Sequence, residues 1–463
     1  MRLPGQNSIL MTLSRYVFLL LAWSLTATSA FAEAVEKTLA NGLKVVVKTD
    51  RRAPVVVSQL WYRAGSMDES YGVTGVAHVL EHMMFKGTQA VPAGEFSRRI
   101  AAVGGRDNAF TSRDVTAYHQ TLQKDRLGLA LQMEADRMTN LVLTPEEFAK
   151  EIRVVMEERR TRTDDNPHAL LFEKLMAATF QSHPYRHPVI GWMADLQQMR
   201  VEDARQWYAQ WYAPNNAVLV VVGDVEPEAV FRLAEEHFGG MASRALPPRR
   251  ATAEPAPSGS KRVSLRAPAR LPSVVLAWQA PRLQDPARDW EPYALEILAG
   301  VLDGHASARL PRALVQEARI AVEAGSGYDP VSRGPGFFFA DATAAEGADI
   351  TAVEAALRAE IRRIQEDGVA ERELERVKAQ VLASQVFQQD SLYYQAMLIG
   401  EWESAGLPWQ AQALRFDRLR AVTAEQVRAV ARKYLIDEGL TVAVLEPAPA
   451  PSPDAGRGEA GQS

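Results

Sequence analysis

Two long stretches of alternating apolar residues mark the beginnings of two similar halves. They cover residues 43–57 and 263–278, and each predicts β-strands with a buried face. Long helical patterns follow both stretches, for example over residues 370–386. Each half then closes on a short apolar run, at residues 217–223 and 440–445. The repeated order predicts a duplicated α+β unit of roughly 200 residues.

Two other segments lack this periodicity and suggest how the chain is divided. A Pro-, Ala-, Arg- and Ser-rich stretch predicts a linker at residues 245–262. Residues 447–463 have the same character and predict a disordered tail. We therefore expect an N-terminal half at residues 33–244 and a C-terminal half at residues 263–446.

The first 32 residues have the pattern of an export signal. Arg15 precedes an apolar run at residues 16–27, and small residues follow, with a site of the A-x-A type that ends at Ala32. The run is short for a membrane span, so we expect cleavage after Ala32 and a periplasmic or extracellular chain without a stable membrane span. An uncleaved anchor is the alternative, and Met11 is an alternative start.

Composition narrows the possible chemistry. The 463 residues include no Cys, which excludes disulfides, thiolate metal sites and cysteine nucleophiles. A net charge of −5 leaves no basic footprint for nucleic acid. Any metal must therefore be held by His and carboxylate side chains. Of the eight His residues only His305 follows the linker, so histidine chemistry belongs to the first half.

The residues that carry the clearest chemical signal form an H-x-x-E-H motif. His78, Glu81 and His82 stand in a helical pattern that starts near Gly75, and they share an arc of about 100° on that helix. Two His at positions i and i+4 can reach one zinc ion, and the Glu between them can act on a water molecule at the metal. The alternative is a solvated polar helix face.

A catalytic zinc site needs a third protein ligand from another element. The helical stretch at residues 147–162 is the best source, because Glu151 and Glu158 lie seven residues apart on one face. Glu158 is the natural third ligand, and Glu151 can orient a ligand from behind. Glu157 is a competitor that points away from this face. A charged surface helix is the alternative.

These residues belong to a longer series of motifs. The series reads LANGLKVVV, GVAHVLEHMMFKGT, GGRDNAFTSRDVTAYH, EIRVVMEERRTRTDDNP, HPYRHPVIG and WYAPNNAVLVVVGDV. With it the chain resembles the insulinase/pitrilysin family of zinc metallopeptidases, which includes the mitochondrial processing peptidases, over nearly the whole length beyond the signal. The resemblance implies one Zn²⁺ per chain on His78, His82 and Glu158, Glu81 as general base, and Glu151 as an additional acidic residue.

The resemblance also implies an architecture and a way of binding substrate. Each half should be an antiparallel sheet of about six strands with helices on one face, and two such chains should enclose a chamber. An edge strand near the zinc should pair with an extended peptide, and Asn108, Ala109, Phe110 and Thr111 match it. An ordinary turn is the alternative for Asn108.

One departure from the family pattern concerns the second half. Active members usually carry an Arg and a Tyr seven residues apart, whereas this chain has Val315 and Val322 there. Loss of such donors costs several kcal/mol of transition-state stabilisation. We therefore expect this chain to be the zinc-bearing subunit of a zinc-dependent endopeptidase of the split bacterial type. It should form a heterodimer with a related zinc-free subunit that supplies the Arg and the Tyr. A self-sufficient but weak peptidase and a non-catalytic scaffold or binding subunit that retains zinc are the alternatives.

Overall fold

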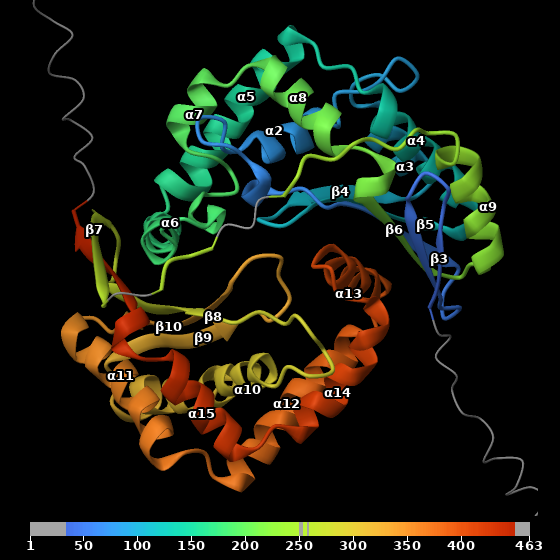
Figure 1. Ribbon diagram of the computed structural model, residues 1–463. Coiled ribbons are helices and arrows are strands. Elements are labelled where there is room, and N and C mark those ends of the chain that lie inside the picture. The colour runs from blue at the N-terminus through green and yellow to red at the C-terminus, as the bar shows by residue number, and fades with distance from the viewer. Residues whose placement is uncertain (1–33, 250–252, 257–258, 450–463) are drawn as a thin grey trace, which may run out of the picture.

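The structure is a computed structural model that describes residues 34–249, 253–256 and 259–449 (Figure 1). The predicted export signal at residues 1–32 lies outside this range, as does nearly all of the predicted tail. The described chain forms two halves that face each other, each built from one sheet and a layer of helices.

The first half contains a six-stranded sheet in the order β1-β2-β6-β3-β5-β4. All neighbours are antiparallel except β2 and β6. Strand β4 lies at an edge, so one side of its backbone has no strand partner in this sheet. The strands are β1 (Val35–Thr38), β2 (Lys44–Thr49), β3 (Val55–Tyr62), β4 (Arg106–Thr111), β5 (Thr116–Gln123) and β6 (Ala217–Gly223).

The second half repeats this plan with five strands in the order β7-β11-β8-β10-β9. Here β7 and β11 are the parallel pair. The strands are β7 (Lys261–Pro268), β8 (Ser273–Ala280), β9 (Ala321–Tyr328), β10 (Gly336–Ala344) and β11 (Thr441–Ala448). Strand β7 thus includes the last two residues of the segment predicted as a linker.

The predicted α+β fold with two matched halves is confirmed, with one correction to the sheets. They are not purely antiparallel, because each contains one parallel pair. The reason is topological: in each half the last strand inserts between the first two long strands. Those two run in opposite directions, so the inserted strand must be parallel to one of them.

Helices cover one face of each sheet, as predicted. In the first half Val56 and Leu60 of β3 point into this helix-covered core, whereas Val57 and Trp61 point to the opposite face. The first-half helices are α2 (Val76–Met83), α3 (Glu95–Ala102), α4 (Leu127–Asn140), α5 (Pro145–Arg159), α6 (Pro167–Thr179), α7 (Met193–Gln198), α8 (Val201–Trp211) and α9 (Pro227–Phe238). The second-half helices are α10 (Glu291–Asp303), α11 (Ile350–Asp367), α12 (Glu371–Gln388), α13 (Leu392–Ser404), α14 (Gln412–Ala421) and α15 (Ala424–Tyr434).

The opposite face of each sheet receives a helix from the other half (Figure 1). Helix α13 places Ala396 and Ile399 against the first sheet, beside Trp61. Helix α6 places Leu171 and Leu175 against the second sheet, in a cluster with residues of β7, β8 and β11. We call this arrangement the reciprocal helix exchange. It buries apolar surface that a single half would leave in water.

The chain between the halves is attached to the body in the parts that the structure describes. The guanidinium of Arg249 donates to Asn216 Oδ1 over 3.1 Å. The carboxylate of Glu254 accepts from the backbone amides of Ser182 and His183, at 2.9 and 2.7 Å. These contacts involve polar side chains and backbone groups only, which explains why an apolar pattern does not indicate them.

Candidate metal centre

Helix α2 presents the H-x-x-E-H residues from a rigid support. Its other face is fully buried, with Val76, Val79, Leu80 and Met83 in the first-half core. The helix begins after Gly75, whose φ of 89° is in the left-handed region. A Cβ at this position would lie only 2.6 Å from the carbonyl oxygen of Ile190, so the turn requires glycine.

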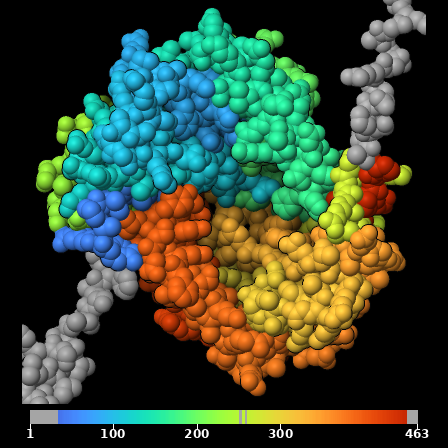
Figure 2. Space-filling view, turned by 180° about the vertical axis from the view of Figure 1, so that it is seen from behind, coloured from blue at the N-terminus to red at the C-terminus, as the bar shows by residue number. Residues whose placement is uncertain are grey.

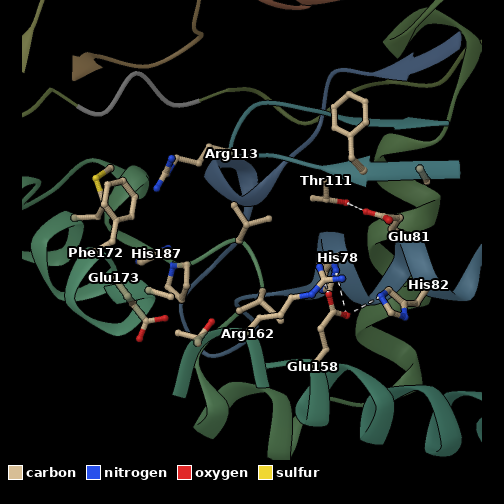
Figure 3. A pocket seen from close by; sticks show the side chains of 18 of the residues that line it. His78, Glu81, His82, Thr111, Arg113, Glu158, Arg162, Phe172, Glu173 and His187 are labelled. Atoms are coloured by element: carbon tan, nitrogen blue, oxygen red, sulfur yellow. Dashed lines mark hydrogen bonds and ion pairs between the residues drawn. The ribbon is translucent and has the colours of Figure 1, made fainter. Parts of the chain in front are cut away.

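Helix α5 brings the predicted third ligand to this face. His82 Nε2 lies 3.3 Å and His78 Nε2 lies 3.9 Å from Glu158 Oε2. One ligand atom from each of the three residues lies within 4.8 Å of the others, which fits a shared metal ion. Glu157 is exposed and pairs with Arg160 instead, at 2.8 Å. The structure thus brings His78, His82 and Glu158 together (Figure 3) and leaves Glu157 outside.

The imidazoles differ in their electrostatic surroundings. Burial, with smaller contributions from His82 and Arg162, lowers the pKa of His78 to about 3, so this ring is neutral and can offer a lone pair. Burial also acts to lower the pKa of His82, but the hydrogen bond from its ring to Glu151 and the nearby carboxylates outweigh it and raise the pKa. A donor set of two imidazoles and one carboxylate suits zinc.

Glu151 lies behind His82, as the sequence predicts. Its Oε1 is 3.0 Å from His82 Nδ1, which can donate while Nε2 faces Glu158. Its Oε2 is 2.5 Å from the ammonium of Lys86, one turn further along the chain from His82. Such a carboxylate fixes the tautomer and orientation of a ligating imidazole. Lys86 was not predicted from the sequence, because it lies beyond the end of α2 and its partner Glu151 is on another helix.

Glu81 is held on the side of the site that faces strand β4. Thr111 Oγ1 donates to Glu81 Oε2 over 2.5 Å. Burial raises the pKa of Glu81, and the Thr111 hydrogen bond opposes that rise. A carboxyl with a raised pKa is suited to accept a proton and release it again near neutral pH. The sequence did not identify Thr111 as a partner of Glu81.

The predicted substrate strand borders the same cavity. Asn108, Ala109, Phe110 and Thr111 line a hollow of about 650 Å³ together with the metal-centre residues (Figure 3). The amide of Ala109 donates to Asn108 Oδ1 over 2.9 Å, so a side chain already occupies this donor. Phe110 points to the other face of the sheet and packs edge-on against Trp61, at 5.4 Å between ring centroids.

Val315 and Val322 lie on the wall of a separate cavity in the second half and do not line the metal-centre cavity. Val322 on β9 is exposed and Val315 packs at the edge of the second-half core. Both line a cavity with the carboxylates of Asp303, Glu323 and Asp341. This wall therefore presents apolar and acidic groups where the family pattern has Arg and Tyr.

Known proteins match both halves of the chain. Residues 44–191 match insulinase (peptidase family M16), and residues 198–381 match the peptidase M16 inactive domain. The zinc protease PqqE of Helicobacter pylori is 34% identical over 320 residues, which cover 68% of this chain and 71% of that protein. An uncharacterized zinc protease of Mycobacterium leprae is 30% identical over 419 residues, which cover 89% and 91%.

Solved structures show the same fold. The crystal structure of a protease from Helicobacter pylori superposes with a TM-score of 0.85 at 28% identity and covers 90% of this chain and 100% of that one. The periplasmic protease PqqL of Escherichia coli, at 20% identity, superposes with a TM-score of 0.77 and covers 91% of this chain but 49% of its own. In the described part of the chain, no helix combines the length and the apolar character that a bilayer span requires.

Two lines of similarity therefore converge with the geometry. The family matches extend over both halves, and relatives named zinc proteases retain 30% identity or more over most of their length. The resemblance predicted from the motifs is confirmed, and the chain belongs to the insulinase family, peptidase family M16.

Proposed function

We propose that the chain is a zinc-dependent endopeptidase that hydrolyses peptides or unfolded polypeptides. The observation that carries the proposal is the position of Glu81. Its carboxyl, held by Thr111, lies between the cluster of His78, His82 and Glu158 and the edge strand β4. A peptide paired with β4 would pass directly by this cluster.

The chain's own residues divide the chemistry among themselves. His78, His82 and Glu158 would hold the ion, which when bound supplies Lewis-acid polarisation of the scissile carbonyl and activation of water. Glu81 takes a proton from the attacking water and passes it to the leaving amine. The backbone of β4 holds the peptide extended and demands little of its sequence.

We further propose that full activity needs a related zinc-free partner that supplies an Arg/Tyr pair. Val315 and Val322 provide no hydrogen-bond donor for a developing oxyanion, which supports this proposal. The chain also matches 49% of the periplasmic protease PqqL of Escherichia coli. This supports the proposal, because the rest of that protein is long enough for a second unit of similar size. From the predicted signal at residues 1–32 we propose that the pair works in the periplasm or outside the cell.

The test compares Glu81→Gln with the parent and with Glu157→Gln as a matched control. Zinc content is measured on the purified chains, and turnover is measured with quenched fluorescent peptides, with and without the co-expressed relative. We expect Glu81→Gln to retain zinc and lose turnover, and Glu157→Gln to retain both, because Glu157 lies outside the cluster. Full turnover by Glu81→Gln would refute the assignment.

Two further outcomes of this experiment are informative. Full activity of a purified homodimer would refute the partner proposal but not the mechanism. Zinc binding without turnover, with every related partner present, would favour a scaffold or binding subunit instead.

A further inference from the structure

Arg113 stands at the junction of two adjoining cavities. It follows the end of β4 by two residues, and its half-buried side chain lines the metal-centre cavity. It also lines a second cavity of about 480 Å³ that includes residues of both halves. Figure 3 shows the Arg113 side chain at the metal-centre cavity, and Figure 2 shows the molecule hollowed between its two halves.

No counter-ion of Arg113 is found among the described residues. No carboxylate of that part of the chain lies within 4.0 Å of its guanidinium, and its buried Nε has no hydrogen-bond partner. The neighbouring Asp114 is already engaged, because it accepts from the hydroxyl of Tyr185 at 2.5 Å and from the backbone amide of Arg333 at 2.8 Å. The contact of Arg113 with Tyr185 is to the ring, 5.8 Å from its centroid.

Of the other two arginines of the metal-centre cavity, Arg162 has an acidic partner, whereas Arg186 has a backbone hydrogen-bond acceptor that Arg113 lacks in the described part of the chain. Arg162 pairs with Glu158 at 2.6 Å, and Arg186 donates to the carbonyl oxygen of Gln181 at 2.7 Å. A guanidinium stays charged in proteins, although burial lowers the pKa of Arg113. A partly buried charge without a partner is unfavourable, so its presence beside a substrate cavity indicates an anion that arrives with the substrate.

The walls of the second cavity would strengthen such a contact. They include the aromatic side chains of Trp61, Phe110, Tyr185, Phe337 and Phe339. They also include the carboxyl groups of Asp114, Asp329 and Glu401, and burial raises the pKa of all three, which favours their neutral forms. An apolar wall excludes water and lowers the local dielectric constant, which increases the attraction between a guanidinium and a carboxylate. The same wall can accept the apolar side chain of a neighbouring substrate residue.

We propose that Arg113 binds a carboxylate of the substrate peptide and so determines specificity. This inference rests on the proposed peptidase function. The carboxylate belongs either to an Asp or Glu side chain near the scissile bond or to the C-terminus of a short peptide. In both cases the guanidinium would form a charge-assisted, bidentate contact with this carboxylate, which the backbone of β4 does not contact.

The experiment measures binding and does not depend on turnover. The zinc-loaded Glu81→Gln chain is titrated with labelled peptides that differ by one Glu or Gln at each position, and with free or amidated C-termini. The same titrations are repeated after Arg113→Gln, after Arg113→Lys and, as a matched control, after Arg186→Gln. Thermal unfolding of every variant confirms that it is folded.

We expect one acidic position, or the free C-terminus, to strengthen binding about tenfold or more over its neutral counterpart. Arg113→Gln should abolish this preference, Arg113→Lys should retain part of it, and Arg186→Gln should leave it unchanged. The single carboxylate that shows the preference identifies the source.

Two results would overturn the inference. One is equal binding of all the acidic and neutral peptides by the parent. The other is an acidic preference that survives Arg113→Gln. The proposed peptidase function can fail separately, through absence of turnover, while these binding ratios still decide the role of Arg113.

Discussion

Removal of Glu151 should weaken zinc binding without unfolding the chain. The carboxylate lies 3.0 Å from His82 Nδ1 and 2.5 Å from Lys86 Nζ, so it serves two positively polarised groups at once. In Glu151→Ala the imidazole loses the acceptor that orients it, and it also faces an ammonium that is no longer neutralised. Both changes disfavour a cation at Nε2.

The expected size of the effect follows from these contacts. Loss of a carboxylate that orients a ligating His costs about 10- to 100-fold in metal affinity, which is about 1.4–2.8 kcal/mol. Glu151→Gln keeps an acceptor for His82 and loses only the charge. We therefore expect a loss near or below tenfold for Gln and a larger loss for Ala.

The assay is a zinc titration against a chromophoric chelator, with circular dichroism as a check on folding. Glu157→Ala is the matched control, because it removes an acid of the same helix that pairs with Arg160 away from the site. Zinc affinity of Glu151→Ala within twofold of the parent, in a folded chain, would refute the role of Glu151.

Two further predictions concern stability. Gly400→Ala should destabilise the chain by about 1–3 kcal/mol in urea unfolding, because its Cβ would lie 2.0 Å from Trp61 Cε2. Gly128→Ala in helix α4 is the control: its Cβ would make only an ordinary van der Waals contact, so this change should be neutral or slightly stabilising. Equal changes in the free energy of unfolding for the two variants would contradict the prediction. Burial and the nearby Glu323 raise the pKa of Asp341 from 3.8 to about 6, so the folded chain binds this proton more tightly than the unfolded chain and loses stability as pH rises through that window. Asp341→Asn should therefore stabilise the chain by about 1–2 kcal/mol at pH 7.5 and by almost nothing near pH 3, and a gain that is equal at both pH values would contradict this account.

Periodicity and motif spacing predicted the parts of the molecule that depend on local order. Both halves and the helical setting of His78 and His82 follow from positions that repeat every 3.6 or 2 residues, whereas the meeting of Glu158 with the two His was expected from the family resemblance. Thr111 on Glu81 could not be predicted in this way, because their contact joins a helix to a strand 30 positions further along the chain. The roles assigned to these residues stay predictions until zinc and turnover are measured.

Long-range packing also explains what the pattern of apolar residues left open. Helices α6 and α13 carry apolar residues that predict burial, but the sequence does not indicate which of the two halves these residues pack against. The insertion of β6 and β11 between earlier strands is equally invisible to a local pattern, since it depends on which edges the folded halves leave available. Arg113 gave no signal, because an unpaired charge is recognisable only once its neighbours are known.

The reciprocal helix exchange has a consequence for how the chain can be divided. Each half completes its inner sheet face with a helix encoded in the other half, so a protease nick between residues 245 and 260 would leave two fragments that still hold each other. Fragments expressed separately would each expose an apolar sheet face and an orphaned amphipathic helix, and they would aggregate unless they were mixed during refolding. The linker predicted from the sequence thus separates the two halves along the chain, but the two halves fold as one cooperative unit.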